Sequence, residues 1–140
     1  YHFFRFDQAG SDQAQNFLST ALIDTTDMPL VIDVEEYTNY EVNETQAQEV
    51  RAVLTEMIAI VESRVGRKVM LYTNKNGYER IIAGFFKDNP IWICDISGSR
   101  PSLSDGREWT MWQYSHNARI KGVQGNVDLN VVQNFANLTH

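Results

Sequence analysis

Short apolar runs alternate along the chain with longer segments in which apolar residues recur every three or four positions. Runs of the first kind predict strands, and segments of the second kind predict amphipathic helices. The clearest helix is expected over 44–65, because Asn43 and Gln46 stand at capping-box spacing before it and Gly66 can end it. Strands are expected at 1–6, 30–35, 68–73, 90–94 and 109–115, further helices at 11–21 and 77–86, and a strand passing into a turn or helix at 127–135. We expect Asp12 and Gln15 to form a capping box at the start of the first helix.

This order of elements predicts an α/β fold in which a parallel sheet is wrapped by helices. The run 29–32 is apolar at every position, as in a strand that is buried on both faces. The chain has 140 residues, of which 43% are hydrophobic, so it can bury a core of ordinary size. No internal repeat, linker or low-complexity tract divides the sequence. We therefore expect residues 1–140 to form a single domain.

Two carboxylates follow this apolar run, at Asp33 and Glu35. Side chains two apart on a strand project from the same face, so both carboxylates should point the same way, opposite to Ile32 and Val34. The C-terminal end of such a strand is where α/β sheets and barrels keep their active sites. A close pair of carboxyl groups is typical of the active site of a glycosidase. The competing interpretation is a solvated loop end or an ion-pair partner, since Asp-x-Glu triplets are common.

Composition excludes several classes of function. The net charge is −6 and no cluster of Lys and Arg occurs, which argues against binding to nucleic acid or to anionic membranes. No apolar stretch approaches the length of a membrane span. The single cysteine, Cys94, excludes a disulfide within the chain, and we expect it to be a small buried hydrophobic residue. The three histidines show no metal-ligand spacing.

Seven short segments, taken in order, resemble the glycoside hydrolase family 25 lysozymes, which are N-acetylmuramidases of phages, bacteria and some fungi. They are YHFFR at 1–5, QAQNF at 13–17, PLVIDVE at 29–35, MLYT at 70–73, IWI at 91–93, WQYS at 112–115 and GNVDLN at 125–130. The resemblance covers essentially the whole chain. It implies a modified (β/α) barrel of the TIM type that cuts the β-1,4 bond between N-acetylmuramic acid and N-acetylglucosamine in peptidoglycan.

The resemblance also assigns roles to residues. Glu35 is similar to the general acid/base, and Asp33 to its partner carboxylate, which acts either as a nucleophile or by orienting the substrate's acetamido oxygen. Burial beside a second carboxylate raises the pKa of an acid, as the role of Glu35 requires. No cofactor and no metal is implied. The residues expected to contact the sugar are Tyr1, Phe3, Tyr72, Trp92, Gln113 and Asp128, although Phe3 and Trp92 can equally be core residues.

The chain departs from the family at its start, since Tyr1 matches the third strand of the barrel. We therefore expect an incomplete barrel that contains strands three to eight, with two unpaired edges. A homodimer that shields these edges is one solution, and a fragment of a longer protein is another. The family acts on the cell wall, so we expect an extracellular protein that is secreted or released by a phage.

Two other hypotheses remain open at this point. One is a glycan-binding module that is derived from the enzyme and holds sugar without cutting it. The other is an unrelated α/β domain that uses Asp33, Glu35 and Asp128 as oxygen ligands for a divalent cation. No glycine-rich phosphate loop accompanies these carboxylates.

Overall fold

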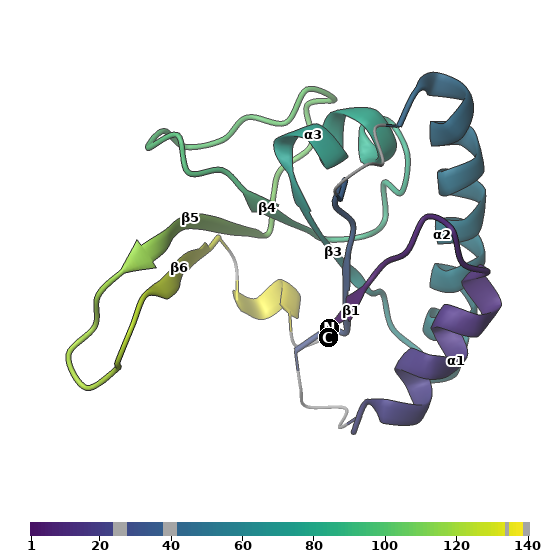
Figure 1. Ribbon diagram of the computed structural model, residues 1–140, viewed down its shortest axis with the longest axis horizontal. Helices are drawn as coiled ribbons and strands as arrows, with labels where there is room; N and C mark the ends of the chain where they lie inside the picture. Colours follow the sequence, from purple (N-terminus) through teal and green to yellow (C-terminus); the bar gives the residue numbers. More distant parts are fainter. Residues whose placement is uncertain (24–27, 38–41, 134, 139–140) are drawn as a thin grey trace.

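The computed structural model describes all residues except 24–27, 38–41, 134 and 139–140 (Figure 1). Six strands form one sheet in sequence order. The strands are β1 (His2–Phe3), β2 (Val31–Asp33), β3 (Met70–Asn74), β4 (Ile91–Cys94), β5 (Met111–Ala118) and β6 (Val127–Val132). The helices are α1 (Gly10–Thr20), α2 (Glu44–Val65), the short α3 (Lys75–Gly77), a π-helix (Tyr78–Ile82) and a 3₁₀ turn (Phe135–Leu138).

The sheet confirms the predicted α/β class but differs in two respects. Strands β1 to β5 run parallel, whereas β6 runs antiparallel to β5. A parallel return needs a crossover of a dozen or more residues, and only residues 119–126 separate the two strands, so they form a hairpin. The sheet is also open, because β1 and β6 do not pair within the described residues. The closed ring of a complete barrel is therefore not formed by this part of the chain.

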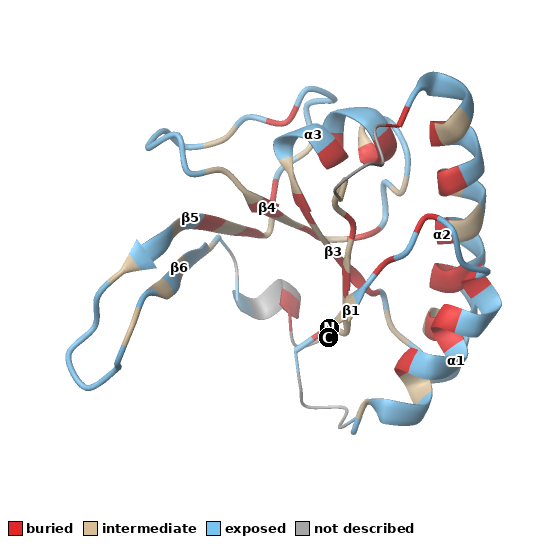
Figure 2. Cartoon of the chain, in the orientation of Figure 1, coloured by how far each residue is buried: buried red, intermediate tan, exposed pale blue. Residues whose placement is uncertain are grey.

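The two long helices cover the same face of the sheet. In Figure 1, α1 and α2 lie side by side along that face, and they contact each other extensively. Ile32 and Val34 project into the core beneath the helices and are fully buried. On the opposite face Met70 and Met111 pack with Leu138 from the C-terminal turn, and Figure 2 shows this smaller buried group apart from the main core. The alternation along β2 therefore separates a helix-covered face from a second face with much less cover.

The ends of the helices show which of the predicted capping residues fix a helix boundary. The Asn43 side chain accepts from the Gln46 backbone amide and Gln46 returns the bond, so the predicted capping box of α2 is confirmed. Gly66 ends α2 in the left-handed conformation, with φ of 71°. The capping box predicted for α1 is wrong, because this helix begins at Gly10, two residues before Asp12, without a side-chain cap. No helix in the described residues is long and apolar enough to cross a membrane.

The helix predicted over 77–86 is replaced by α3 and the π-helix, which ends at Ile82. A distant aspartate holds this segment in place. The Asp105 carboxylate accepts from the Tyr78 hydroxyl at 2.6 Å, from the Gly84 amide at 2.9 Å and from Arg107 Nε at 2.9 Å. Burial alone acts to raise the pKa of Asp105, but these hydrogen bonds outweigh it and hold the pKa well below its usual range.

Candidate active site

A cavity of about 330 Å³ opens on the face of the sheet that α1 and α2 leave uncovered. Strands β2 to β6 each contribute to it. Its lining consists of Tyr1, Val31, Asp33, Glu35, Tyr72, Trp92, Gln113 and Asp128. The structure thus brings together seven of the eight side chains that the sequence analysis selected.

Phe3 is the exception, because it does not line the cavity. It is 40% exposed, and its ring centroid lies 5.7 Å from that of Tyr37. Tyr1 and Phe3 are two apart at the end of β1, yet only Tyr1 reaches the cavity. Strand β1 has two residues rather than the six that we expected, so the strict alternation of a strand does not extend over both positions.

The two carboxylates enter the cavity from the end of β2. Asp33 is the last residue of the strand, and Glu35 follows two positions later on the same side. The backbone between them is fixed by neighbouring strands, since the Phe4 amide donates to the Asp33 carbonyl at 2.9 Å and the Val34 amide to the Tyr72 carbonyl at 2.8 Å. Both carboxylates are therefore carried on a rigid part of the sheet.

The electrostatics of this pair are unusual for surface acids. Burial, and next the charge of Glu35, raise the pKa of Asp33 from 3.8 to about 7. The Asp33 Oδ1 atom is buried, and no hydrogen-bond partner for it occurs in the described part of the chain. Burial also raises the pKa of Glu35, although a hydrogen bond from Tyr72 acts in the opposite direction. Burial thus favours the protonated form of both acids, and the charge of Glu35 adds to this effect at Asp33.

Polar and aromatic side chains form the wall opposite the carboxylates. The Tyr72 hydroxyl donates to Gln113 Oε1 at 2.5 Å, and the Tyr72 ring meets Trp92 edge-on with centroids 5.0 Å apart. Trp92 Nε1 in turn donates to Asn130 Oδ1 at 2.8 Å. Asn130 was not selected from the sequence as a site residue, although it ends the GNVDLN segment and pairs with Gln113 in the β5–β6 register. This chain of contacts presents an aromatic surface, amide groups and the carboxylate of Asp128 to the same cavity.

Cys94 differs from the buried hydrophobic residue that we expected. Cys94 is half-buried rather than buried, and burial raises the pKa of its thiol. It follows Trp92 by two residues on β4, so it lies on the same face of the sheet as the cavity.

Among the described residues, no group of three or more His, Cys, Asp or Glu side chains is arranged to hold a metal ion. The divalent-cation hypothesis therefore has no support from the geometry.

Comparison with known proteins identifies relatives of the chain. The sequence model of the family described as Glycosyl hydrolases family 25 matches residues 1–123. The structure of a family 25 glycosyl hydrolase from Bacillus anthracis is 36% identical and superposes with a TM-score of 0.91, covering 100% of this chain and 67% of that one. YegX, an uncharacterized protein of Escherichia coli, is 34% identical over 131 residues, which are 94% of this chain and 46% of YegX. Lysozyme M1 of Streptomyces globisporus is 30% identical over 142 residues, covering 93% of this chain and 47% of the lysozyme.

The chain spans about half the length of these two curated relatives. The family match nevertheless extends over most of the chain, and it includes the strand that carries the paired carboxylates. On this evidence, the chain belongs to glycosyl hydrolases family 25.

Proposed function

We propose that this chain is the catalytic part of a peptidoglycan hydrolase that cleaves the β-1,4 bond between N-acetylmuramic acid and N-acetylglucosamine. The observation that carries the proposal is the pair Asp33 and Glu35, which share one cavity and both have a raised pKa. A glycosidase needs one protonated and one ionised carboxyl group, and burial of two neighbouring acids in one cavity favours the retention of a proton there. Family membership and the likeness to Lysozyme M1 support the choice of substrate.

In this mechanism the proton that Asp33 keeps in the free protein passes to Glu35 when substrate binds, and Glu35 gives it to the oxygen of the bond that breaks. The proton is then no longer available to Asp33, whose carboxylate faces the positive charge that develops on the sugar ring. Asp33 acts either by attacking the anomeric carbon or by orienting the acetamido oxygen of the substrate for that attack. Glu35 afterwards takes a proton from the incoming water, which restores the pair.

The remaining cavity residues are assigned to substrate binding. Trp92 and Tyr1 offer flat apolar surfaces for sugar rings, while Gln113 and Asp128 offer polar atoms for hydroxyl and acetamido groups. The single hydroxyl proton of Tyr72 is donated either to Gln113, as in this structure, or to Glu35, whose pKa that hydrogen bond lowers. Phe3 stays a candidate for a sugar contact beyond the cavity, where it is exposed beside Tyr37.

The test is an analysis of new reducing ends after digestion of purified peptidoglycan. We expect N-acetylmuramic acid reducing ends from the wild type and at least a hundred-fold fewer from Glu35→Gln, because general acid catalysis contributes about 10²–10⁴-fold. Glu49→Gln is the matched control, since it makes the same chemical change at an exposed position on α2. Release of N-acetylglucosamine reducing ends, or equal activity of the Glu35 variant, would show that the assignment is wrong.

A second candidate function is glycan binding without cleavage. It is favoured by the open sheet, because one side of the cavity lacks the further strands of a closed barrel. The same digestion separates the two functions when it is combined with co-sedimentation on insoluble peptidoglycan. Binding without any new reducing ends, by a folded protein, would establish the binding module.

We further infer that the six strands are part of a (β/α) barrel, and that a second copy of the chain covers the free edge of β1 in a homodimer. The edge strand is only two residues long, and Tyr1 beside it is 87% exposed. An unpaired edge next to an exposed aromatic side chain favours association. Light scattering during size-exclusion chromatography tests this, and a mass of 16.1 kDa would refute it. We place the protein outside the cell, at its substrate.

A further inference from the structure

The hairpin formed by β5 and β6 projects well beyond the body of the molecule (Figure 1). Its inner part is supported by a third strand, because Met111, Trp112 and Gln113 pair with β4. Beyond Gln113, β5 pairs only with β6, and the register is irregular there. A two-stranded ribbon without further support has marginal stability in water. The outer hairpin therefore contributes little to the fold, which makes a contact with another molecule the better explanation for its length.

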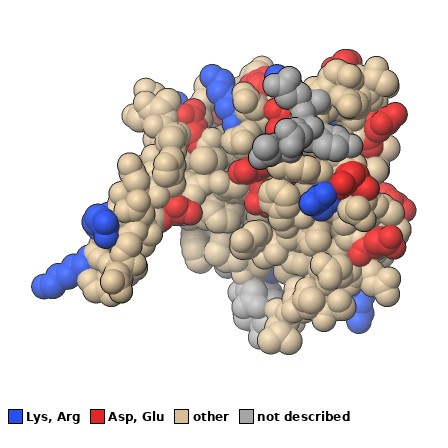
Figure 3. All heavy atoms as spheres, viewed as in Figure 1, with Lys and Arg blue, Asp and Glu red and all other residues tan. Residues whose placement is uncertain are grey.

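The outer hairpin has a surface unlike the rest of the protein. Arg119 and Lys121 stand in the connection between the strands, and no Asp or Glu occurs between residues 116 and 126. Both cations are exposed, and neither makes a salt bridge within the described residues. Figure 3 shows basic atoms at the outer end of the hairpin and acidic atoms nearer the body. The whole chain has a net charge of −6, so the outer hairpin is a positively charged surface on a negatively charged protein.

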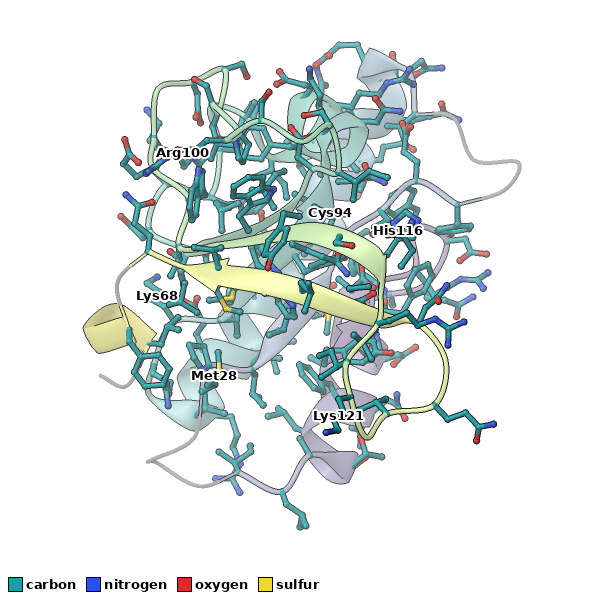
Figure 4. All side chains as sticks on the ribbon, turned by 90° about the vertical axis from the view of Figure 1, so that its left-hand side faces the viewer. Met28, Lys68, Cys94, Arg100, His116 and Lys121 are labelled. Carbon is teal, nitrogen blue, oxygen red and sulfur yellow. The ribbon has the colours of Figure 1, made fainter. Side chains whose placement is uncertain are left out.

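Apolar side chains accompany these charges. Ile120 is 47% exposed and Val123 is 50% exposed, on either side of Lys121. Figure 4 looks along the hairpin, with His116 on the β5 arm and Lys121 at the tip. We refer to Arg119, Ile120, Lys121 and Val123 as the hairpin tip. A basic and partly apolar surface of this kind suits an anionic peptide better than an uncharged sugar.

The hairpin is continuous with the cavity, which limits what can reach its tip. Gln113 on β5 and Asp128 on β6 line the cavity, and Trp92 is tied to the base of the hairpin through Asn130. Ala118, the last residue before the tip, pairs with Val127, which is the neighbour of the cavity residue Asp128. The tip therefore begins beside the part of the cavity wall that Asp128 forms, and a molecule bound in the cavity can reach it by extending past Asp128.

We propose that the hairpin tip binds the carboxylates of the stem peptides that peptidoglycan carries on its N-acetylmuramic acid residues. This proposal rests on the proposed function, because it takes the glycan strand in the cavity as the reason why a stem peptide lies near the tip. Arg119 and Lys121 pair with the peptide carboxylates, while Ile120 and Val123 contact its aliphatic side chains. The tip thereby distinguishes peptide-bearing glycan from bare glycan.

The test is co-sedimentation with beads that carry peptidoglycan coupled through the reducing ends of its glycan strands, one preparation with its stem peptides and one from which an amidase has removed them. Wall-linked phosphate polymers are extracted from both, and the lactyl carboxylates that the amidase exposes are converted to amides, so that the stems carry the remaining anionic groups. All proteins carry Glu35→Gln to prevent digestion. The variants are Arg119→Glu with Lys121→Glu, the milder Arg119→Gln with Lys121→Gln, and a control, Arg64→Glu with Lys87→Glu. The control changes net charge equally at two exposed cations remote from the hairpin.

We expect the hairpin charge reversal to weaken binding to intact peptidoglycan by about two- to thirty-fold, the range for two exposed ion pairs. The glutamine variant should lose less, and the control should lose nothing. Binding to peptide-free glycan should be the same for all proteins. Raising ionic strength from about 0.01 M to 0.15 M shortens the Debye length from about 30 Å to 8 Å, and it should remove most of the difference.

Equal losses on both preparations, an equal loss in the control, or no loss on intact peptidoglycan would each overturn the proposal. A loss that appears only when phosphate polymers are left in place would assign the tip to those polymers instead. If the protein that carries Glu35→Gln alone fails to bind peptide-free glycan at all, it is the glycan site of the proposed function that fails. Thermal unfolding of each variant checks that the substitutions leave the fold intact.

Discussion

Asp33→Asn should make this protein more stable, by an amount that grows with pH. The pKa of Asp33 is about 7 in the folded protein, compared with an ordinary value of 3.8. Below 3.8 the folded and unfolded states are both protonated, so the carboxyl group contributes no difference. Between 3.8 and about 7 the unfolded chain releases its proton while the folded protein keeps it, and the free energy of unfolding therefore falls as pH rises. Above about 7 the destabilisation is complete.

The size of the effect follows from the same shift. A pKa difference from 3.8 to about 7 sets an upper limit of about 4 kcal/mol, at 1.36 kcal/mol for each unit of pKa. The carboxylate lines an open cavity and is only partly buried, so water screens part of this energy. We expect roughly 1–2 kcal/mol to remain. An uncharged asparagine avoids this term and keeps nearly the same shape.

Urea unfolding of the wild type and of Asp33→Asn at several values between pH 4 and 8 measures the effect. The difference in unfolding free energy should be near zero at the acid end and should reach its full size at the alkaline end. Glu49→Gln serves as the control, because it replaces a carboxylate by an amide at an exposed position on α2. A flat difference for Asp33→Asn, or one that decreases with pH, would refute the reasoning about the buried carboxylate.

Three further substitutions test other parts of the structure. Tyr72→Phe removes a hydrogen bond that lowers the pKa of Glu35, so an NMR titration of that carboxyl group should give a higher pKa than in the wild type. Gly77→Ala would place a Cβ atom 2.8 Å from the Val34 carbonyl oxygen, and urea unfolding should show a loss of about 1–3 kcal/mol. Asp105→Asn should lower stability at neutral pH by about 2–3 kcal/mol. Because the pKa of Asp105 is lowered on folding, that loss should shrink as the pH falls below its ordinary 3.8, and a constant loss would contradict the role of its charge.

The part of the site that was predictable lies on single strands. A period of two fixes that Asp33 and Glu35 share a face, and this holds although β2 ends at Asp33. The contact between Tyr72 and Trp92 depends on the register of β3 against β4, which the local sequence does not contain. The resemblance to the family supplied these partners, and the geometry then explained why they meet.

The features that the sequence analysis missed depend on the direction of a strand and on contacts between residues that are distant in sequence. Apolar patterning marks 127–132 as a strand but does not say which way it runs, and the signal for an antiparallel return was the short connection at 119–126. The break in the helix predicted over 77–86 depends on Asp105, which lies 27 residues after Tyr78. Neither the helical periodicity of that segment nor its capping residues report such a partner.

Two aspartates of this chain show why burial alone does not identify a site. Burial acts to raise the pKa of both Asp33 and Asp105, yet the first is raised and the second is lowered. The difference lies in the donors, because Asp105 accepts from Tyr78, Gly84 and Arg107 whereas Asp33 Oδ1 accepts from none. An acid that only holds the fold together is stabilised by its donors in the ionised form. Asp33 lines the cavity, and its Oδ1 atom is buried without a donor among the described residues, so no interaction within the fold accounts for this charge, which is what the proposed function expects of a reacting acid.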